Sequence, residues 1–420
     1  MRYAIQGATV EQVKAVGATA IKEARSINII FATLTTEQVA KLKAQGVIVG
    51  LIAGVKAAVM PSPRVPAPVA AEPIYSAEEL LFVAGYDRLR SITTPPLYGA
   101  GFNLAMVDSG IRSTHSMIKG RVVHSKNFTT DVMGDNFDHG TGTASLAVAV
   151  APQCNLLNLK VLDSKGFGTE EEVILAIDYC IALRDEGSSI APHVINLSLG
   201  SPDEGNPNSP MRIACRAAID RAIWIFASGG NDGPAPGKIM SPACERYVSC
   251  TGSVKYDPYV ISEFSSRGPT KENLTKPDAC MWGENFIVAS SVSDTATVAK
   301  SGTSFSNPLA AGMAILTREG MYRQAVLADP VAGLDPETGW RMTVEDLIDY
   351  YYPIICVKPA GIIVGKDNDY GYGLPFPDTI LQAVGFRPAI GMEVLMSSIT
   401  PLLGIGILSM LMSGLMKSFR

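Results

Sequence analysis

The sequence predicts an α/β protein, in which a mostly parallel twisted sheet with helices on both faces follows a small α+β domain. Three observations lead to this fold class. Short apolar runs alternate with helical stretches from about residue 80 to residue 386, as in a parallel sheet covered on both sides. A proline- and alanine-rich segment separates this region from the first 58 residues. The length of 420 residues also exceeds the size at which one core usually stops growing.

The first domain, residues 1–58, shows strand and helix patterns in alternation. Thr36, Glu37 and Gln38 provide capping chemistry at the start of its second helix, and Gly46 ends that helix. We expect strands at Tyr3 to Gln6, Ile29 to Ala32 and Val47 to Ile52, and helices at Val10 to Val16 and Thr36 to Gln45.

Residues 59–75 are expected to form a linker, because Pro61 to Pro73 is too rich in proline and too poor in apolar bulk to pack. The main domain then spans residues 76–386, and a hydrophobic tail spans residues 387–420. Apolar runs predict main-domain strands at Asn103 to Val107, Leu156 to Val161, Val194 to Leu199, Ile223 to Ala227, Tyr247 to Gly252 and Phe286 to Ala289.

Charge and cysteine content exclude several classes of protein. A net charge of -5 lacks the basic footprint of a nucleic-acid partner. The seven cysteines include no C-x-x-C pair, which argues against a zinc cluster or a dense disulfide framework. We expect buried free thiols, with a Cys244–Cys250 bridge left open. The N-terminus lacks the apolar run of a secretory signal, and the localisation stays unknown.

Four segments place a reactive side chain where an apolar run ends, which is where open α/β sheets carry their sites. The first ends in Asp108-Ser109-Gly110, and the second contains His139 before the apolar helix Ala144 to Ala151. The third is Ala227 to Asn231, with Ser228, Gly229 and Gly230 before the asparagine. The fourth contains Ser304 and Pro308 before a helix at Leu309 to Thr317, and we expect Pro308 in the first helical turn.

These side chains supply the parts of an acyl-transfer site. A serine hydroxyl becomes a strong nucleophile when an imidazole takes its proton, and a carboxylate orients that imidazole. Ser304, His139 and Asp108 are the candidates for these three roles. The Asn231 amide can donate a hydrogen bond to the oxyanion, together with the backbone at the helix N-terminus that holds Ser304.

In the order Asp108, His139, Asn231, Ser304, the four motifs resemble the subtilase family. This resemblance implies a subtilisin-like serine endopeptidase that acts on protein or peptide substrates and is made as a zymogen. Residues 3 to 56 resemble the family's propeptide inhibitor domain, which implies that the chain's own propeptide is a partner. The alternative is a catalytically silent scaffold or peptide-binding module with the same fold. A serine hydrolase that acts on esters is a third interpretation, and the substrate-pairing strand at Ser198 to Gly200 argues against an esterase.

The resemblance also implies substrate-binding segments. Ser198, Leu199 and Gly200 resemble the strand that pairs with an extended substrate, and Gly166, Phe167 and Gly168 resemble its partner on the other side of the peptide. Ser228, Gly229 and Gly230 are expected to line the same cleft. Met240 falls where relatives keep a glycine at the base of the primary specificity pocket. A bulkier floor there favours small or medium residues at the cleavage site.

The pattern departs from the family where relatives bind calcium. No calcium-binding loop follows His139, and Met117 stands where relatives use an acidic residue. We therefore expect no metal at that site and no cofactor, and leave calcium open at sites that the sequence does not identify.

The C-terminal tail has no charged residue from Val394 to Met416, a stretch long enough to cross a bilayer core of about 30 Å. It predicts a membrane anchor. A helix that docks on a partner protein is the alternative, because Pro401 and many methionines suit an amphipathic contact.

Overall fold

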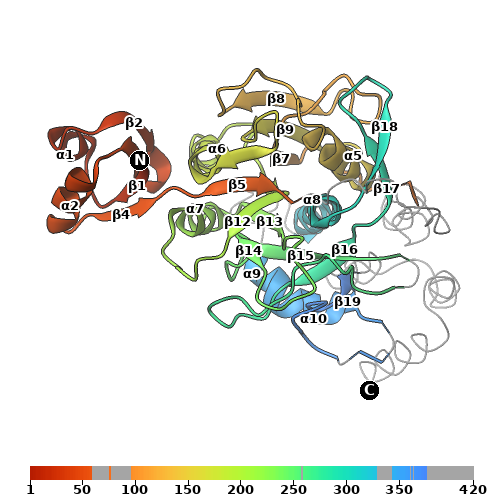
Figure 1. The fold of residues 1–420 in the computed structure, drawn as a ribbon. Coiled ribbons are helices and arrows are strands. Elements are labelled where there is room, and N and C mark those ends of the chain that lie inside the picture. The colour runs from red at the N-terminus through yellow and green to blue at the C-terminus, as the bar shows by residue number, and fades with distance from the viewer. Residues whose placement is uncertain are drawn as a thin grey trace, which may run out of the picture.

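The computed structural model describes residues 1–58, 75–76, 96–256, 259–328, 343–359, 361–362 and 364–375. Figure 1 shows a small N-terminal unit beside a larger α/β body, joined by the chain that runs from β4 (Ile48–Leu51) into β5 (Gly54–Ala57). The N-terminal unit has an antiparallel sheet in the order β2-β3-β1-β4 and two helices. Its further elements are β1 (Arg2–Gln6), α1 (Val10–Ala15), β2 (Thr19–Ala24), β3 (Ile29–Thr33) and α2 (Thr36–Ala44).

The two faces of the N-terminal sheet have different partners, because side chains alternate along a strand. Ile5 and Ile30 face the unit's own core with Val13 and Leu42 from the two helices. Ala4, Ala24, Ile29 and Phe31 instead join the core cluster of the large body. The sheet therefore docks through its second face, where β2 and the short turn at Arg25–Ile27 contact α6 (Glu170–Asp185).

A seven-stranded, fully parallel sheet forms the centre of the body, in the order β16-β15-β13-β11-β7-β9-β8. Its strands are β7 (Asn103–Asp108), β8 (Val122–Asn127), β9 (Asn155–Lys160), β11 (Val194–Leu197), β13 (Trp224–Ser228), β15 (Ser249–Val254) and β16 (Ala279–Trp282). The predicted α/β class is thus confirmed, but one predicted member is wrong. The apolar run at β17 (Phe286–Ala289) pairs with β18 (Thr297–Lys300) and β6 (Tyr75–Ser76) in a separate small sheet.

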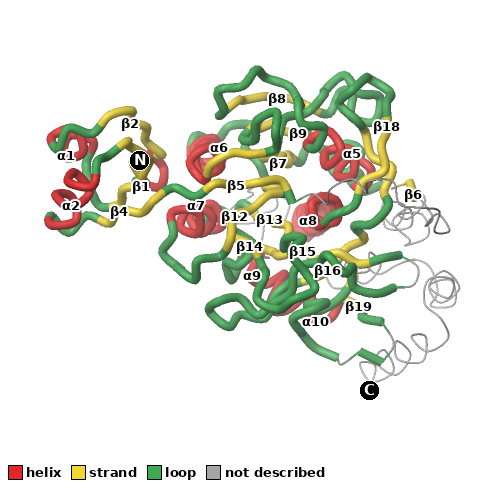
Figure 2. The backbone as a smooth tube through the Cα atoms, in the orientation of Figure 1, coloured by secondary structure: helices red, strands yellow, loops and turns green. Residues whose placement is uncertain are grey.

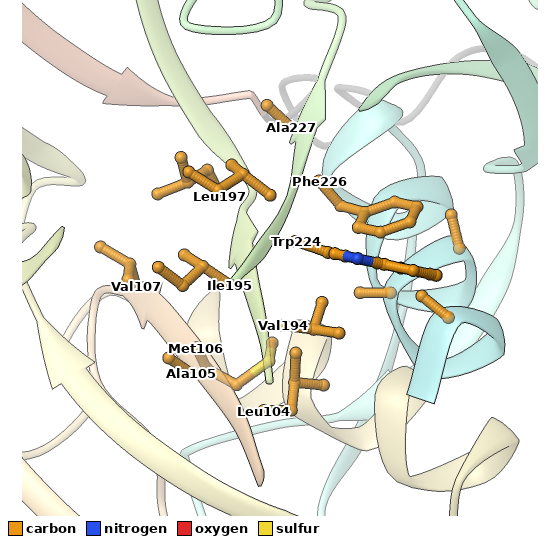
Figure 3. Packing of buried hydrophobic residues seen from close by; sticks show 14 of the residues in the cluster. Leu104, Ala105, Met106, Val107, Val194, Ile195, Leu197, Trp224, Phe226 and Ala227 are labelled. Carbon is orange, nitrogen blue, oxygen red and sulfur yellow. The ribbon is translucent and has the colours of Figure 1, made fainter. Parts of the chain in front are cut away.

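Helices cover both faces of the parallel sheet, and its central strands β7, β11 and β13 are buried along their whole length. α5 (Gly140–Val150) and α8 (Thr303–Ala328) pack together on one face, and α6 and α7 (Pro210–Ile219) on the other. Trp224 and Phe226 point toward α8, whereas Ile195 and Leu197 point to the opposite side (Figure 3). A Cβ atom on Gly312 of α8 would lie 2.8 Å from Val150 Cβ, so glycine allows the close approach of α5 and α8.

Shorter elements surround the ends of this sheet, and Figure 2 shows how loops connect them. They are β10 (Phe167–Thr169), β12 (Leu199–Pro202), β14 (Met240–Ser241), α9 (Val344–Asp346), α10 (Tyr352–Ile355), β19 (Cys356–Val357) and β20 (Leu374–Pro375). Nearly all of the predicted linker, residues 59–75, and the whole tail, residues 387–420, lie outside the described residues. Within the described ranges, no helix has the length and apolar character needed to span a membrane.

Candidate active site

Asp108 is the last residue of the central strand β7, and the fold buries it completely. Its Oδ1 lies 2.6 Å from His139 Nδ1 and accepts a 2.7 Å hydrogen bond from the Ser109 backbone N–H. Its Oδ2 accepts from Thr143 Oγ1 at 3.1 Å. A carboxylate with these donors stays oriented toward the imidazole and can stabilise its protonated form.

His139 precedes the first turn of α5 and is also completely buried. The carboxylate of Asp135 holds its loop: Oδ1 accepts from Ser109 Oγ at 2.8 Å and from the backbone N–H groups of Asp138 and His139. Gly140 is required by close approach, because a Cβ atom there would lie 2.2 Å from the Gly110 carbonyl oxygen.

Ser304 lies in the first turn of α8, which begins at Thr303 and not at Leu309 as predicted. Pro308 consequently falls in the second turn, which corrects the expected first-turn position. Because proline has no N–H, it leaves the Ser304 carbonyl without its helical donor. Ser198 Oγ donates a 3.0 Å hydrogen bond to the Ser304 carbonyl in its place, and this bond connects the start of α8 to the end of β11.

The Asn231 side chain is oriented by Thr303. Asn231 Oδ1 accepts from both the backbone N–H and the Oγ1 of Thr303, each at 2.9 Å. Its Nδ2 therefore points the other way and donates to the Ala58 carbonyl at 2.5 Å. The Ser304 backbone N–H donates to the same oxygen at 3.4 Å. Two convergent donors on one carbonyl, next to a serine hydroxyl, form the geometry of an oxyanion hole.

The chain's own strand β5 occupies the cleft between β10 and β12. Phe167 pairs with Lys56, and Gly168 with Val55, on one side. Leu199 pairs with Ala57 on the other side, and both pairings are antiparallel. The Gly166 carbonyl accepts from the Ala57 N–H at 3.2 Å, and the Ser198 carbonyl from the Ala58 N–H at 3.3 Å. The two strands that were expected to bind substrate thus hold residues 54–58 in an extended conformation, which ends at the Ala58 carbonyl between the Asn231 and Ser304 donors.

Met240 is buried and pairs with Pro202 at the end of β12, one of the two strands that border this cleft. Its N–H donates to the Gly229 carbonyl at 3.0 Å. A Cβ atom on Gly230 would lie 2.7 Å from Met240 Cγ, and one on Gly200 would lie 3.0 Å from Met240 Cβ. The methionine side chain therefore packs between the two glycine-containing segments. Ser228, the neighbouring residue of the third motif, ends β13 and is buried.

The serine and the histidine are not hydrogen-bonded to each other. Ser304 Oγ donates to the Ser198 carbonyl at 2.9 Å. His139 Nε2 is buried and has no hydrogen-bond partner among the described residues. Asp108 and His139 are thus assembled, whereas the Ser304 hydroxyl points to a different acceptor.

Sequence reasoning missed several side chains that position this site, namely Asp135, Thr143, Thr303, Lys300 and Asp138. Two of them directly precede a predicted site residue: Asp138 comes before His139, and Thr303 comes before Ser304. Their position in the motifs was the available signal, but their partners are distant in the sequence. The contact between Asp138 and Lys300 crosses 162 residues.

Other expectations concern residues outside this candidate site. All seven cysteines are free thiols, and Cys244 and Cys250 form no bridge. Burial raises the pKa of Cys250 to about 12, which keeps this thiol protonated and unreactive. His115, His124 and His193 hydrogen-bond to Ala296, Tyr179 and Asn103, respectively, which is consistent with structural roles. Within the described ranges, there is no group of three or more His, Cys, Asp or Glu side chains that could hold a metal ion.

Comparison with known sequences finds several proteases among the relatives of this chain. The sequence model of the subtilase family matches residues 99–345. Serine protease AprX of Bacillus subtilis (strain 168) is 28% identical over 255 residues, which cover 52% of this chain and 57% of that protein. Subtilisin of Bacillus sp. (strain TA39) is 29% identical over 303 residues, 66% of this chain and 67% of the relative. An intracellular serine protease of Paenibacillus polymyxa is 28% identical over 239 residues, 53% of this chain and 68% of the relative.

Proposed function

The chain belongs to the subtilase family, and on this premise we propose that it is a serine endopeptidase with Ser304 as nucleophile, His139 as general base and Asp108 as its orienting carboxylate. The observation that carries the proposal is the position of the Ala58 carbonyl. Asn231 Nδ2 and the Ser304 N–H both donate to this oxygen, as they would to a scissile carbonyl under attack.

The first chemical step follows from these contacts. Rotation about the Cα–Cβ bond of Ser304 moves its hydroxyl from the Ser198 carbonyl toward His139 Nε2, which accepts the proton as Oγ attacks the carbonyl carbon. The negative charge that develops on the carbonyl oxygen is stabilised by Asn231 and by the backbone at the start of α8. His139 then returns the proton to the leaving amine, and water completes hydrolysis of the acyl-enzyme by the same route.

We also propose that residues 1–58 are an inhibitory propeptide and that the first substrate is the chain itself. β5 pairs with both β10 and β12, and it delivers Ala58 to the catalytic residues. The bond to be cut is then Ala58–Val59. After this cleavage, the second face of the N-terminal sheet keeps the domain docked on α6, with β5 still in the cleft.

The proposed specificity follows from Met240. Ala58 lies between Ser198, which bonds its N–H, and Asn231, which bonds its carbonyl oxygen. Met240 packs against Gly200 and Gly230, the glycines beside these two segments, and so limits the depth available to the side chain at position 58. Small side chains such as alanine are therefore the preferred residues before the cleaved bond.

The second candidate is a silent scaffold that keeps its N-terminal domain in the cleft permanently. One observation favours it: Ser304 Oγ bonds to the Ser198 carbonyl and leaves His139 Nε2 without a partner among the described residues. A fluorophosphonate probe separates the two candidates, because it reacts with a serine that its histidine activates. We expect labelling of the chain after cleavage near residue 58 and none of Ser304→Ala. Absence of labelling, even after limited proteolysis between residues 58 and 75, would refute the proposal that the chain is an enzyme.

The membrane anchor predicted for residues 394–416 remains a separate proposal, with docking on a partner protein as its alternative. Sedimentation of the full chain with carbonate-washed membranes, lost on truncation after Gly385, would support the anchor. Solubilisation of the full chain by carbonate would support docking instead.

A further inference from the structure

The residue before His139 forms an ion pair that the catalytic chemistry does not use. Asp138 has a backbone φ of +64°, a left-handed conformation that Asp and Asn adopt more readily than other non-glycine residues. Its Oδ2 lies 3.2 Å from Lys300 Nζ, and the same ammonium group donates to the Asp138 backbone carbonyl. The Lys300 side chain is 14% exposed and that of Asp138 is 27% exposed, so water screens the pair only in part.

The carboxylate of Asp138 has further donors at the end of β17. Its Oδ1 accepts from Ser290 Oγ at 2.9 Å and from the Ser291 N–H at 2.5 Å. Burial raises the pKa of Asp138, but the Lys300 ammonium and the Ser291 and Ser290 hydrogen bonds outweigh burial and hold the pKa below its ordinary value. Asp138 is therefore charged at neutral pH, and both of its oxygens are engaged.

Lys300 connects this carboxylate to the segment that carries the nucleophile. It is the last residue of β18 and precedes Ser304 by four positions. The intervening segment is fixed by the Gly302 N–H, which donates to the Gly283 carbonyl at 2.8 Å, and by Ser301 Oγ, which accepts from the Asn285 N–H at 3.0 Å. Asp138 and Lys300 thus link the His139 loop to the segment that leads into α8.

The loop that carries His139 is held from two sides by two different carboxylates. Asp135 ties it to Ser109, the neighbour of Asp108. Asp138 ties it to Lys300, on the strand that leads to Ser304. The Asp135 contact holds the His139 loop next to Asp108. The Asp138 contact holds the same loop next to the strand that leads to Ser304.

We propose that Asp138 and Lys300 are a pair of positioning residues that sets the separation between His139 Nε2 and Ser304 Oγ in the reacting state. This inference rests on the proposed function. Proton transfer requires the two heavy atoms to come within roughly 2.6–3.2 Å, and a misplacement of about 1 Å can lower a rate about 100-fold. A partly exposed ion pair contributes little to global stability, so catalysis and stability separate when the pair is removed.

The test uses the full-length chain and removes each partner conservatively. Asp138→Asn keeps a side chain that tolerates the left-handed backbone, and its Oδ1 can still accept from Ser290 and Ser291. Lys300→Met keeps most of the length of the side chain and removes its charge. We expect both variants to lower kcat on a peptide and the first-order rate of self-cleavage by about 10- to 100-fold, with KM within about twofold. The Tm should stay within a few degrees of the parent.

Further variants separate a pairwise effect from two independent ones. The double variant should be no slower than the slower single variant, because each substitution already breaks the same contact. Lys300→Arg should recover most of the rate, because it restores the charge beside Asp138. Arg221→Met is the matched control: it removes the 2.7 Å ion pair with Asp185 at the opposite end of the parallel sheet, and kcat should not change.

Three outcomes would overturn the inference. They are unchanged kcat in both single variants, multiplied effects in the double variant, or a loss of kcat that follows a loss of Tm. A parent chain that neither cleaves itself nor reacts with the probe would instead refute the proposed function. In that case the nitrogen resonance of His139 Nε2, the atom that faces the proposed proton transfer, decides the inference separately in the uncleaved chain with Ser304 in place. Lys300→Met should shift or broaden this resonance, and an unchanged resonance would overturn the pair's role.

Discussion

Replacing Met240 by alanine tests the proposed link between the cleft floor and the choice of substrate. The side chain of Met240 is buried between Gly200 and Gly230, so the substitution should open space below the residue that precedes the cleaved bond. The parent should cleave peptides with alanine at that position better than otherwise identical peptides with phenylalanine. Met240→Ala should move this preference toward phenylalanine.

The size of the change can be estimated from the atoms involved. Full burial of a phenylalanine side chain is worth about 1.5–3 kcal/mol. Met240→Ala removes Cγ, Sδ and Cε, which is less volume than a phenyl ring occupies, so we expect about half of that value. A gain of about 0.8–1.5 kcal/mol corresponds to roughly a 4- to 12-fold rise in the ratio of kcat/KM for phenylalanine over alanine.

The ratio of two kcat/KM values is the appropriate measure, because both substrates compete for the same fraction of active enzyme. It therefore stays valid if the smaller side chain destabilises the protein, as loss of a buried methionine commonly does by about 2–5 kcal/mol. Met240→Leu, which nearly conserves volume, is the control and should keep the parental ratio. A parent that already prefers phenylalanine, or a ratio that Met240→Ala leaves unchanged, would refute the assignment of Met240 to the pocket.

The remaining predictions concern the oxyanion hole, self-cleavage, docking and metal. Asn231→Ala should lower kcat about 10²- to 10³-fold, a loss of about 2.7–4 kcal/mol, with little change in KM; an effect under threefold on peptide hydrolysis would remove Asn231 from the hole. Purified wild-type chain should show a new N-terminus directly after Ala58, whereas Ser304→Ala should stay intact, and cleavage of that variant would point to another protease. Burial raises the pKa of Glu171, but hydrogen bonds from Arg2 and Lys22 outweigh burial and hold it below the ordinary value of 4.5. Charged Glu171 therefore stabilises the docked N-terminal domain above pH 4.5. This stabilisation is lost as pH falls through the lower pKa that Glu171 has in the docked state. Gel filtration of the cleaved complex should show release of the N-terminal domain that depends on pH, and Glu171→Gln should abolish this pH dependence. The same pH dependence in both proteins would contradict the role of Glu171 in docking. Finally, a chelator should leave the Tm unchanged, and a large drop would reveal a bound cation.

The sequence predicted the central strands because a strand that is buried on both faces must be apolar throughout. β7, β11 and β13 meet this condition, and each was expected within a few residues of its observed bounds. β8 was missed because it lies at the sheet edge and mixes half-buried residues, such as His124, with exposed ones, such as Ser125 and Lys126, so no apolar run marks it. β17 is apolar but pairs elsewhere, which the apolar pattern alone does not indicate.

The candidate catalytic residues lie in short local motifs, and this is why the sequence pointed to them. Their supporting contacts join segments that are far apart. Asp135 fixes the His139 loop through four backbone N–H groups and one hydroxyl, a role that depends on the path of the loop and not on its composition. The Pro308 misplacement has a similar origin: the helix begins earlier than its apolar pattern, because polar Ser304 and Asn307 are buried inside the site.

The orientation of the Ser304 hydroxyl bears on the choice between an enzyme and a silent scaffold. Asp108 and the backbone of the His139 loop are each held by several hydrogen bonds, and Asn231 is held by Thr303, so these groups need not move for the first step. The hydroxyl alone must exchange one acceptor, the Ser198 carbonyl, for another, His139 Nε2. Such an exchange replaces one hydrogen bond by another and rotates a single bond, which is fast compared with peptide cleavage. The observed orientation therefore raises no barrier of its own, and the rate of cleavage after Ala58 is the quantity that distinguishes the two candidates.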